Sequence, residues 1–148
     1  NIDKVCNMVA YFASNCVGLF KVKLMKMLWY ADSLCYKLYG HAMTGLVYCH
    51  EDMGALPVGH YKIGGLQLVM VEEEYDYENV KYRFLPNEKL DEVSLSINER
   101  KILDMVIDKF KTYTAQQIID YMHDEIAYKM TKDKEIIPFS LAKQIRDF

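Results

Sequence analysis

The chain has 148 residues, of which 51% are hydrophobic and 26% are charged, with a formal net charge of −3. This is the composition of an ordinary globular protein, and the length suits one domain that buries roughly 70% of its unfolded surface without help from disulfides or metals. No apolar run approaches the roughly 20 residues that cross a bilayer. The charge disfavours a stand-alone nucleic-acid binder, which would show a basic face. We therefore expect a single domain over residues 1–148 with no direct contact to nucleic acid or membrane.

The start of the sequence and its cysteines indicate the cellular compartment of the protein. No basic and apolar signal peptide opens the chain, and Cys6, Cys16, Cys35 and Cys49 mostly occupy apolar helical positions. Reduced thiols in a cytoplasmic protein fit this pattern best. The chain opens with Asn1 rather than methionine, which suggests a segment excised from a longer protein that has an upstream part.

Two helices are predicted at the start of the chain. Residues 2–15 carry apolar side chains at helical spacing, and Gly18 follows as an end signal. A short connection leads to a second helix, from about residue 24, that stops at Gly40. With so short a connection, we expect the two helices to form an antiparallel hairpin.

The second helix is the most informative part of the sequence, because almost all of its circumference is apolar. One stripe at 3.6-residue spacing is aliphatic and consists of Leu24, Met27, Leu28, Ala31, Leu34, Cys35 and Leu38. The neighbouring stripe is aromatic, with one carboxylate in its middle, and consists of Met25, Trp29, Asp32, Tyr36 and Tyr39. The side chains left to face water are Lys23, Lys26, Tyr30, Ser33 and Lys37. Such a helix is either packed centrally in its domain or shared between its own core and a partner.

A β-hairpin follows a weakly patterned stretch. Glycines and Pro57 interrupt residues 46–65, for which we predict a loop and then one short helix from about Pro57. Residues 68–75 and 80–85 alternate in the manner of strands, and residues 76–79 can supply the turn between them.

The rest of the chain is predicted to be helical. After a connection over residues 86–95, Ser96 and Glu99 form a capping box that starts a helix, and Thr114 with Gln117 repeats the device. The polar run 132–135 predicts a turn, and Ser140 is a candidate cap for a final helix. The predicted fold class is α+β: a predominantly α-helical single domain with a small β-hairpin.

The segment from Lys23 to Asp32, with Tyr36, Tyr39-Gly40 and Thr44-Gly45 after it, resembles the Panacea antitoxin domain, also called SocA-like and first noted in phage-associated proteins. Further landmarks in the same order extend the resemblance over essentially the whole chain: Gly54-Ala55-Leu56-Pro57, the Glu-rich hairpin, His123-Asp124-Glu125, Tyr128, Ile136-Ile137-Pro138-Phe139 and Ala142.

The resemblance implies a prokaryotic antitoxin of a type II toxin-antitoxin system, which binds and neutralises a cognate protein toxin usually encoded beside it. It implies no catalysis and no cofactor, and family members often carry an upstream DNA-binding or zinc-binding segment. The motif residues, for partner binding or for structure, are Trp29, Asp32, Tyr36, Thr44, Gly54, Pro57, His123 and Glu125. An alternative function is the sensor or oligomerisation domain of a transcription regulator with an upstream DNA-binding segment, and self-association is possible in either case.

Two polar motifs leave a choice between structure and function. Asp32 lies between Trp29 and Tyr36 and either accepts hydrogen bonds from the backbone or Tyr hydroxyls or contacts a basic residue of a partner; the structural role is favoured, because buried polar groups usually serve the fold. His123 and Glu125 either clamp the following segment or form an acid/base pair. Positions so close together do not share a helix face, which disfavours catalysis.

Other chemistry is weakly supported. Cys35, Cys49, His50 and His60 are potential zinc ligands, but no pair has Cys-x-x-Cys spacing, and Cys49 beside His50 is a weak candidate for cysteine catalysis. Gly64-Gly65 is not followed by the Lys-Ser/Thr pair of a phosphate-binding loop. The acidic run 72–74, with Asp76 and Glu78, is either a solvated surface or an attractant for a basic toxin.

Overall fold

The computed structural model describes residues 1–89 and 94–148 and has the predicted α+β fold. β1 pairs antiparallel with β2, and β3 pairs antiparallel with β4. The elements in chain order are α1 (Ile2–Asn15), α2 (Lys21–Tyr39), β1 (Tyr48–Glu51), β2 (Gly54–Pro57), the 3₁₀ helix η1 (His60–Gly65), β3 (Met70–Asp76), β4 (Asn79–Leu85), α3 (Ile97–Phe110), α4 (Ala115–His123), α5 (Ile126–Lys129) and α6 (Phe139–Ala142).

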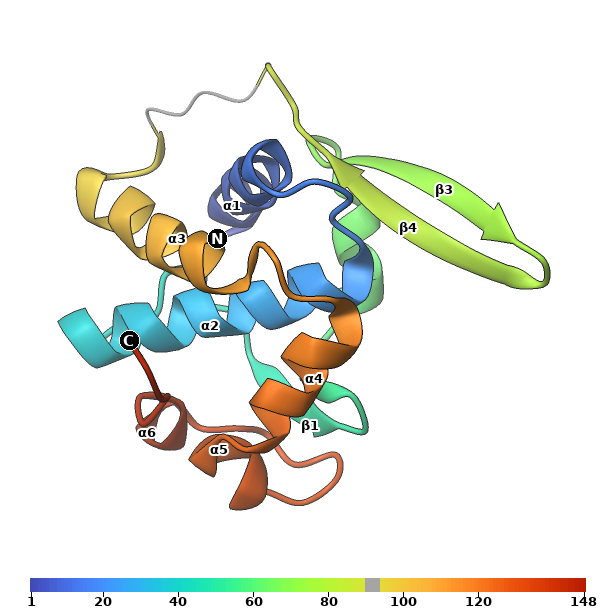
Figure 1. Cartoon of the computed structure of the whole chain (residues 1–148). Coiled ribbons are helices and arrows are strands. Elements are labelled where there is room, and N and C mark those ends of the chain that lie inside the picture. Colours follow the sequence, from blue (N-terminus) through green and yellow to red (C-terminus); the bar gives the residue numbers. More distant parts are fainter. Residues whose placement is uncertain (90–93) are drawn as a thin grey trace.

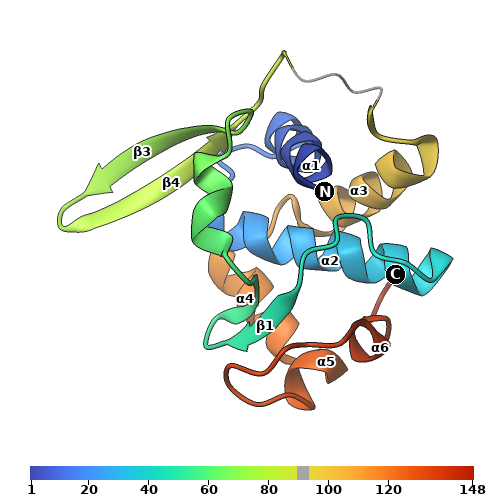
Figure 2. The ribbon, with the colours of Figure 1, turned by 180° about the vertical axis from the view of Figure 1, so that it is seen from behind.

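Helix α2 lies at the centre of the molecule. Figure 1 shows α1 and α3 on one side of it and α4 on the other, and Figure 2 shows the β1–β2 hairpin against its back. Every residue of α2 from Lys23 to Cys35 is buried, so central packing describes this helix. None of the described helices is long and apolar enough to cross a membrane.

The predicted water-facing edge of α2 is wrong except at Lys37. Tyr30 and Ser33 are fully buried, whereas Leu38 and Tyr39 at the end of the predicted stripes are exposed. The Lys23 Nζ donates to the carbonyl oxygens of Lys111, 3.1 Å away, and Tyr113, 2.8 Å away, just after α3. The free carbonyl groups at a helix C-terminus attract a cation, which permits burial of this lysine.

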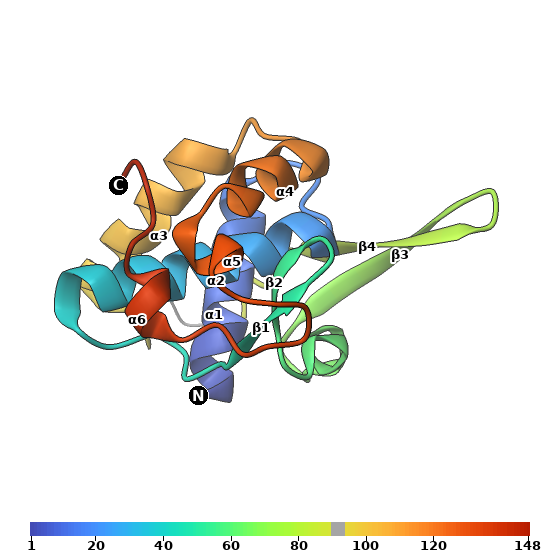
Figure 3. The same cartoon turned by 90° about the horizontal axis from the view of Figure 1, so that it is seen from below.

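Helix α1 has the predicted bounds but not the predicted packing. It ends at Asn15, where Cys16 turns extended, and Gly18 lies beyond it in the connection with a φ of 62°. Figure 3 shows α1 crossing α2 instead of running antiparallel to it. The connection between α1 and α2 is held by β4, because the backbone N–H of Phe84 donates to the Leu19 carbonyl oxygen, 2.8 Å away.

The loop predicted over residues 46–65 contains the β1–β2 hairpin. Tyr48 pairs with Pro57, and Glu51 pairs with Gly54. The other edge of β1 is also satisfied: the His50 N–H donates to Glu135 O at 2.8 Å, and the Ile137 N–H donates to Tyr48 O at 2.9 Å. The predicted short helix corresponds to η1, which begins three residues after Pro57.

The cap signals of the C-terminal half are mostly confirmed. Both capping boxes form, at Ser96 and at Thr114, and residues 132–135 turn as predicted. The Ser140 prediction is wrong, because α6 begins one residue earlier and its N-cap is Pro138. The predicted connection over 86–95 falls partly outside the described residues, and α5 was not expected from the sequence.

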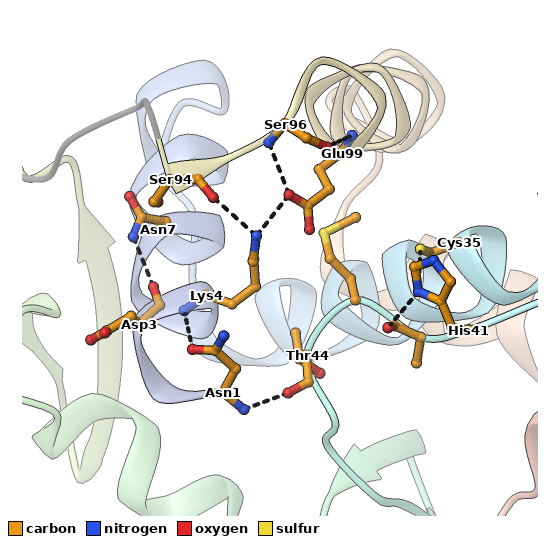
Figure 4. A network of polar contacts seen from close by, with 12 residues as sticks. Asn1, Asp3, Lys4, Asn7, Cys35, His41, Thr44, Ser94, Ser96 and Glu99 are labelled. Carbon is orange, nitrogen blue, oxygen red and sulfur yellow. Dashed lines mark hydrogen bonds and ion pairs between the residues drawn. The ribbon is translucent and has the colours of Figure 1, made fainter. Parts of the chain in front are cut away.

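Polar contacts tie α1 to its neighbours (Figure 4). The Lys4 Nζ lies 2.7 Å from Oε1 of Glu99, the same carboxylate that caps α3, and 3.0 Å from the Ser94 carbonyl oxygen. The Asn1 nitrogen donates to the Thr44 carbonyl oxygen, 2.6 Å away. Helix α1 is therefore joined both to α3 and to the segment between α2 and β1.

Candidate protein-interaction site

Asp32 organises the segment that leaves α2. Its side chain is fully buried, and Oδ1 accepts from the backbone N–H groups of Met43, 2.8 Å away, and Thr44, 2.9 Å away. Oδ2 accepts from the hydroxyls of Thr44 and Tyr48, each 2.6 Å away. Burial raises the pKa of Asp32, and these hydrogen bonds oppose the rise. The carboxylate thus fastens the chain between α2 and β1 from inside the domain.

The aromatic stripe of α2 packs against the rest of the same chain. The Trp29 indole is 1% exposed and meets the Tyr30 ring edge-on, with ring centroids 4.9 Å apart. The Tyr36 ring stacks on Phe139 of α6, with centroids 5.3 Å apart. Neither Trp29 nor Asp32 is available on the surface of the folded chain, and Tyr36 is partly covered.

Gly54 allows the β1–β2 hairpin to approach α2 closely. Its φ is 118°, and a Cβ at this position would lie 2.7 Å from the Met122 Sδ and 2.9 Å from the Lys26 Cε. The Lys26 side chain is 1% exposed and its Nζ donates to the Ala55 carbonyl oxygen at 3.2 Å. Burial lowers the pKa of Lys26 to about 8. Pro57 is buried at the end of β2.

His123 holds the turn between β1 and β2. Its Nε2 lies 3.1 Å from the Asp52 carbonyl oxygen, and its ring stacks on Tyr128, which in turn stacks on His50. The Tyr128 hydroxyl donates to the Glu51 carbonyl oxygen at 2.6 Å. Three stacked rings therefore close over the hairpin turn.

Glu125 serves a different segment. The carboxylate is fully buried, and Oε1 accepts from the Nε of Arg146 at 2.6 Å and from its backbone N–H at 3.2 Å. His123 contacts the β1–β2 turn instead. The structure thus gives the two motif residues separate partners, an arrangement that fits clamping of segments and not an acid/base pair.

The candidate metal and cysteine sites are dispersed. Within residues 1–89 and 94–148, no group of three or more His, Cys, Asp or Glu side chains is placed to hold a metal ion. All four cysteines are free thiols; the Cys49 Sγ lies 3.3 Å from Glu51, and His50 points its Nδ1 at the Thr131 hydroxyl. Burial raises the pKa of Cys49, so this thiol is poorly activated for attack.

The β3–β4 ribbon, residues 70–85, is largely exposed and projects away from the helices in all three views (Figures 1–3). The turn falls at Tyr77 and Glu78, inside the predicted range, and β3 begins two residues later than predicted. Side chains that are paired across two antiparallel strands share a face. One face is mainly apolar and comprises Val71, Glu73, Tyr75, Val80, Tyr82 and Phe84; the other is mainly polar and comprises Met70, Glu72, Glu74, Asp76, Asn79, Lys81, Arg83 and Leu85.

The apolar face of the ribbon is covered at its base and open toward its tip. Phe84 is 3% exposed, whereas Tyr82 is 40%, Val80 is 42% and Tyr75 is 72% exposed. A groove of about 280 Å³ lies where the base meets η1 and the start of α2; its lining includes Tyr61, Lys21, Val71 and Tyr82. The sequence indicated the hairpin and its acidic run, but the exposure of this face depends on how the ribbon leaves the body.

Comparison with known families identifies the chain. A family model described as "Antitoxin SocA-like, Panacea domain" matches residues 24–128. The chain belongs to this SocA-like family. No curated protein and no solved structure matches it. The matched range includes most of α2, the β1–β2 hairpin, the ribbon and the His123 clamp, so the resemblance inferred from the sequence is confirmed over residues 24–128. The landmarks at residues 136–139 and at Ala142 lie beyond the matched range.

Proposed function

We propose that this chain is a non-catalytic antitoxin module of a type II toxin-antitoxin system that binds a cognate protein toxin in the cytoplasm. The observation that carries the proposal is the match of the SocA-like antitoxin model over residues 24–128. A domain of this kind acts by occupying a surface of the toxin, so it needs a stable scaffold and an accessible contact face, not a reactive group.

The distribution of polar groups supports a scaffold. Asp32, Glu125 and Lys26 are buried and bonded to backbone or side-chain groups of the chain itself. Buried polar groups with such partners fix one arrangement of the surrounding segments. We propose that the motif residues act in this way, maintaining the domain shape that the toxin binds.

The test is co-expression with the product of the adjacent gene. That protein is placed under an inducible promoter in a bacterial host, with and without the present chain. We expect growth to stop when it is induced alone, to recover when the chain is present, and the two proteins to purify together. Absence of both rescue and complex would refute the proposal, and a DNA-binding segment upstream without either result would favour the alternative of a regulator's sensor domain.

A further inference from the structure

The β3–β4 ribbon has an apolar face that the fold leaves open. Tyr75 and Tyr82 lie on the same face, with Val80 directly opposite Tyr75. Their exposed fractions are large for side chains on the apolar face of a hairpin. Because an isolated two-stranded ribbon has little stability of its own in water, contact with a partner on this face would stabilise it. Tyrosine is among the residues most enriched at protein interfaces, because it buries a large area and keeps a polar end.

The turn of the ribbon gives a second indication that this element contacts a partner. Tyr77 is fully exposed and has a φ of 54°, in the left-handed region. Glycine or asparagine adopts that conformation at lower cost, and an aromatic side chain there gains nothing from the folded body. A strained and exposed tyrosine at the tip of an aromatic face is accounted for if the side chain contacts something outside the chain.

The charge of the ribbon selects the kind of partner. Residues 70–85 contain five of the 21 acidic residues and two of the 18 basic ones, so the remainder of the chain is balanced at sixteen of each sign. Arg83 forms an ion pair with Glu74 at 2.5 Å, which cancels one charge of each sign and leaves the net charge of the ribbon at −3, five acidic residues less two basic ones. Two such acidic ribbons would repel one another, which disfavours a second copy and favours a basic surface.

We infer that the open apolar face of the ribbon, centred on Tyr75 and Tyr82, is the surface that docks a protein toxin presenting an apolar patch bordered by Lys and Arg side chains. The inference rests on the proposed function and adds the contact surface and the chemistry of the partner. The groove beside Tyr82 and Tyr61 accommodates a side chain of the partner at the base of the ribbon. The acidic residues act on the approach of the partner, whereas the tyrosines hold it once bound.

The inference is tested with purified wild-type chain and the purified product of the adjacent gene, by titration calorimetry. Tyr75→Ser and Tyr82→Ser are each expected to weaken binding about 10- to 100-fold. Asn79→Ser, on the same ribbon but on its polar face, is the matched control and should change the affinity less than about 2-fold. Thermal unfolding midpoints measured for all variants separate a loss of contact from a loss of folding.

The outcomes separate the two proposals. If the wild type neither binds nor rescues, the proposed function fails and this inference fails with it. If the wild type binds and both tyrosine variants bind equally well, only the docking surface is wrong. A wild-type chain that forms a dimer by itself, which Tyr75→Ser dissociates, would assign the face to a second copy and overturn the inference. An association rate that does not fall as salt is raised would refute the basic character of the partner.

Discussion

The α2 region and the β3–β4 ribbon use aromatic side chains in opposite ways. Trp29 and Tyr30 of α2 are almost completely buried, whereas Tyr75 and Tyr77 of the ribbon are 72% and 100% exposed. All four residues lie within the family match. The aromatic residues of α2 that carry the family resemblance pack inside the domain, whereas the ribbon leaves its aromatic residues exposed, and we propose that this exposed element supplies the contact area for a partner.

Replacing Trp29 is expected to have the largest effect on the buried side of this comparison. Trp29→Ala removes an indole that is 1% exposed and leaves a cavity beside α2, for which we expect a loss of about 3 to 5 kcal/mol in the free energy of unfolding. Chemical denaturation measures it. Tyr61→Ala, at a side chain that is 70% exposed, should change stability by less than about 0.5 kcal/mol. A variant of Trp29 that melts like the wild type yet no longer binds its partner would place this residue in the interface.

Removing the Asp32 carboxylate is expected to have the next largest effect on stability. Asp32→Ala leaves two buried N–H groups and two hydroxyls without their acceptor, and we expect a loss of about 3 kcal/mol. Asp32→Asn keeps one acceptor oxygen for the backbone groups and should cost about half as much. Asp120→Ala is the control, because that carboxylate is exposed on α4 and bonds only to Gln116 among the contacts described. Equal stability of the alanine and asparagine variants would contradict the hydrogen-bonding role.

Gly54 tests how closely the β1–β2 hairpin must approach α2. Gly54→Ala places a Cβ 2.7 Å from the Met122 Sδ and 2.9 Å from the Lys26 Cε, at a φ that alanine rarely adopts. We expect a loss of about 2 kcal/mol in the free energy of unfolding. Gly64→Ala has open space and no positive φ, so it should not destabilise the chain. Similar melting of the two variants would show that the hairpin can move away from α2 at little cost.

The buried Lys26 predicts a pH dependence. Its folded-state pKa is about 8 against roughly 10.4 in an unfolded chain, so between these values the unfolded state binds more protons and stability rises with pH. Below pH 8 both states are charged and the cost of burying the ammonium is fully present. From pH 7 to 9.5 we expect a gain of about 1 to 2 kcal/mol in wild type relative to Lys26→Met. If this difference is independent of pH, Lys26 is not buried as a charge.

The smallest expected effect belongs to the ribbon. Tyr75→Ser removes a side chain that is 72% exposed and should change the free energy of unfolding by less than about 0.5 kcal/mol. Denaturation next to the Trp29 variant measures the contrast directly. A loss above about 1.5 kcal/mol would mean that Tyr75 serves the fold, and the comparison between the two regions would no longer hold.

Local signals predicted most of this fold, and long-range contacts account for what they missed. The capping boxes at Ser96 and Thr114, the end of α2 at Gly40 and the β3–β4 turn depend on neighbouring residues, so the sequence indicates them directly. The β1–β2 hairpin has short strands, and residues 134–137 bond its outer edge from far along the chain. A local sequence pattern does not predict pairing between segments so far apart in the chain.

The same distinction applies to the candidate site. The sequence offered hydrogen bonding as one role for Asp32, but it could not show that Thr44 and Tyr48 supply the donors. It predicted Lys26 on a solvated edge, because lysine is rarely buried. The Lys26 Nζ instead donates to the Ala55 carbonyl oxygen, which lies on a strand that the sequence did not indicate. The acidic run of the ribbon was visible in the sequence; the open aromatic face beside it required the register and the direction of the ribbon.

Hydrogen exchange of the chain, alone and mixed with the purified product of the adjacent gene, shows which backbone amides the partner covers and so tests whether the ribbon is the docking surface. We expect new protection of backbone amides concentrated in residues 70–85, with α2 equally protected in both samples because it is buried already. Protection that develops around α2 or the β1–β2 hairpin while the ribbon exchanges unchanged would contradict it.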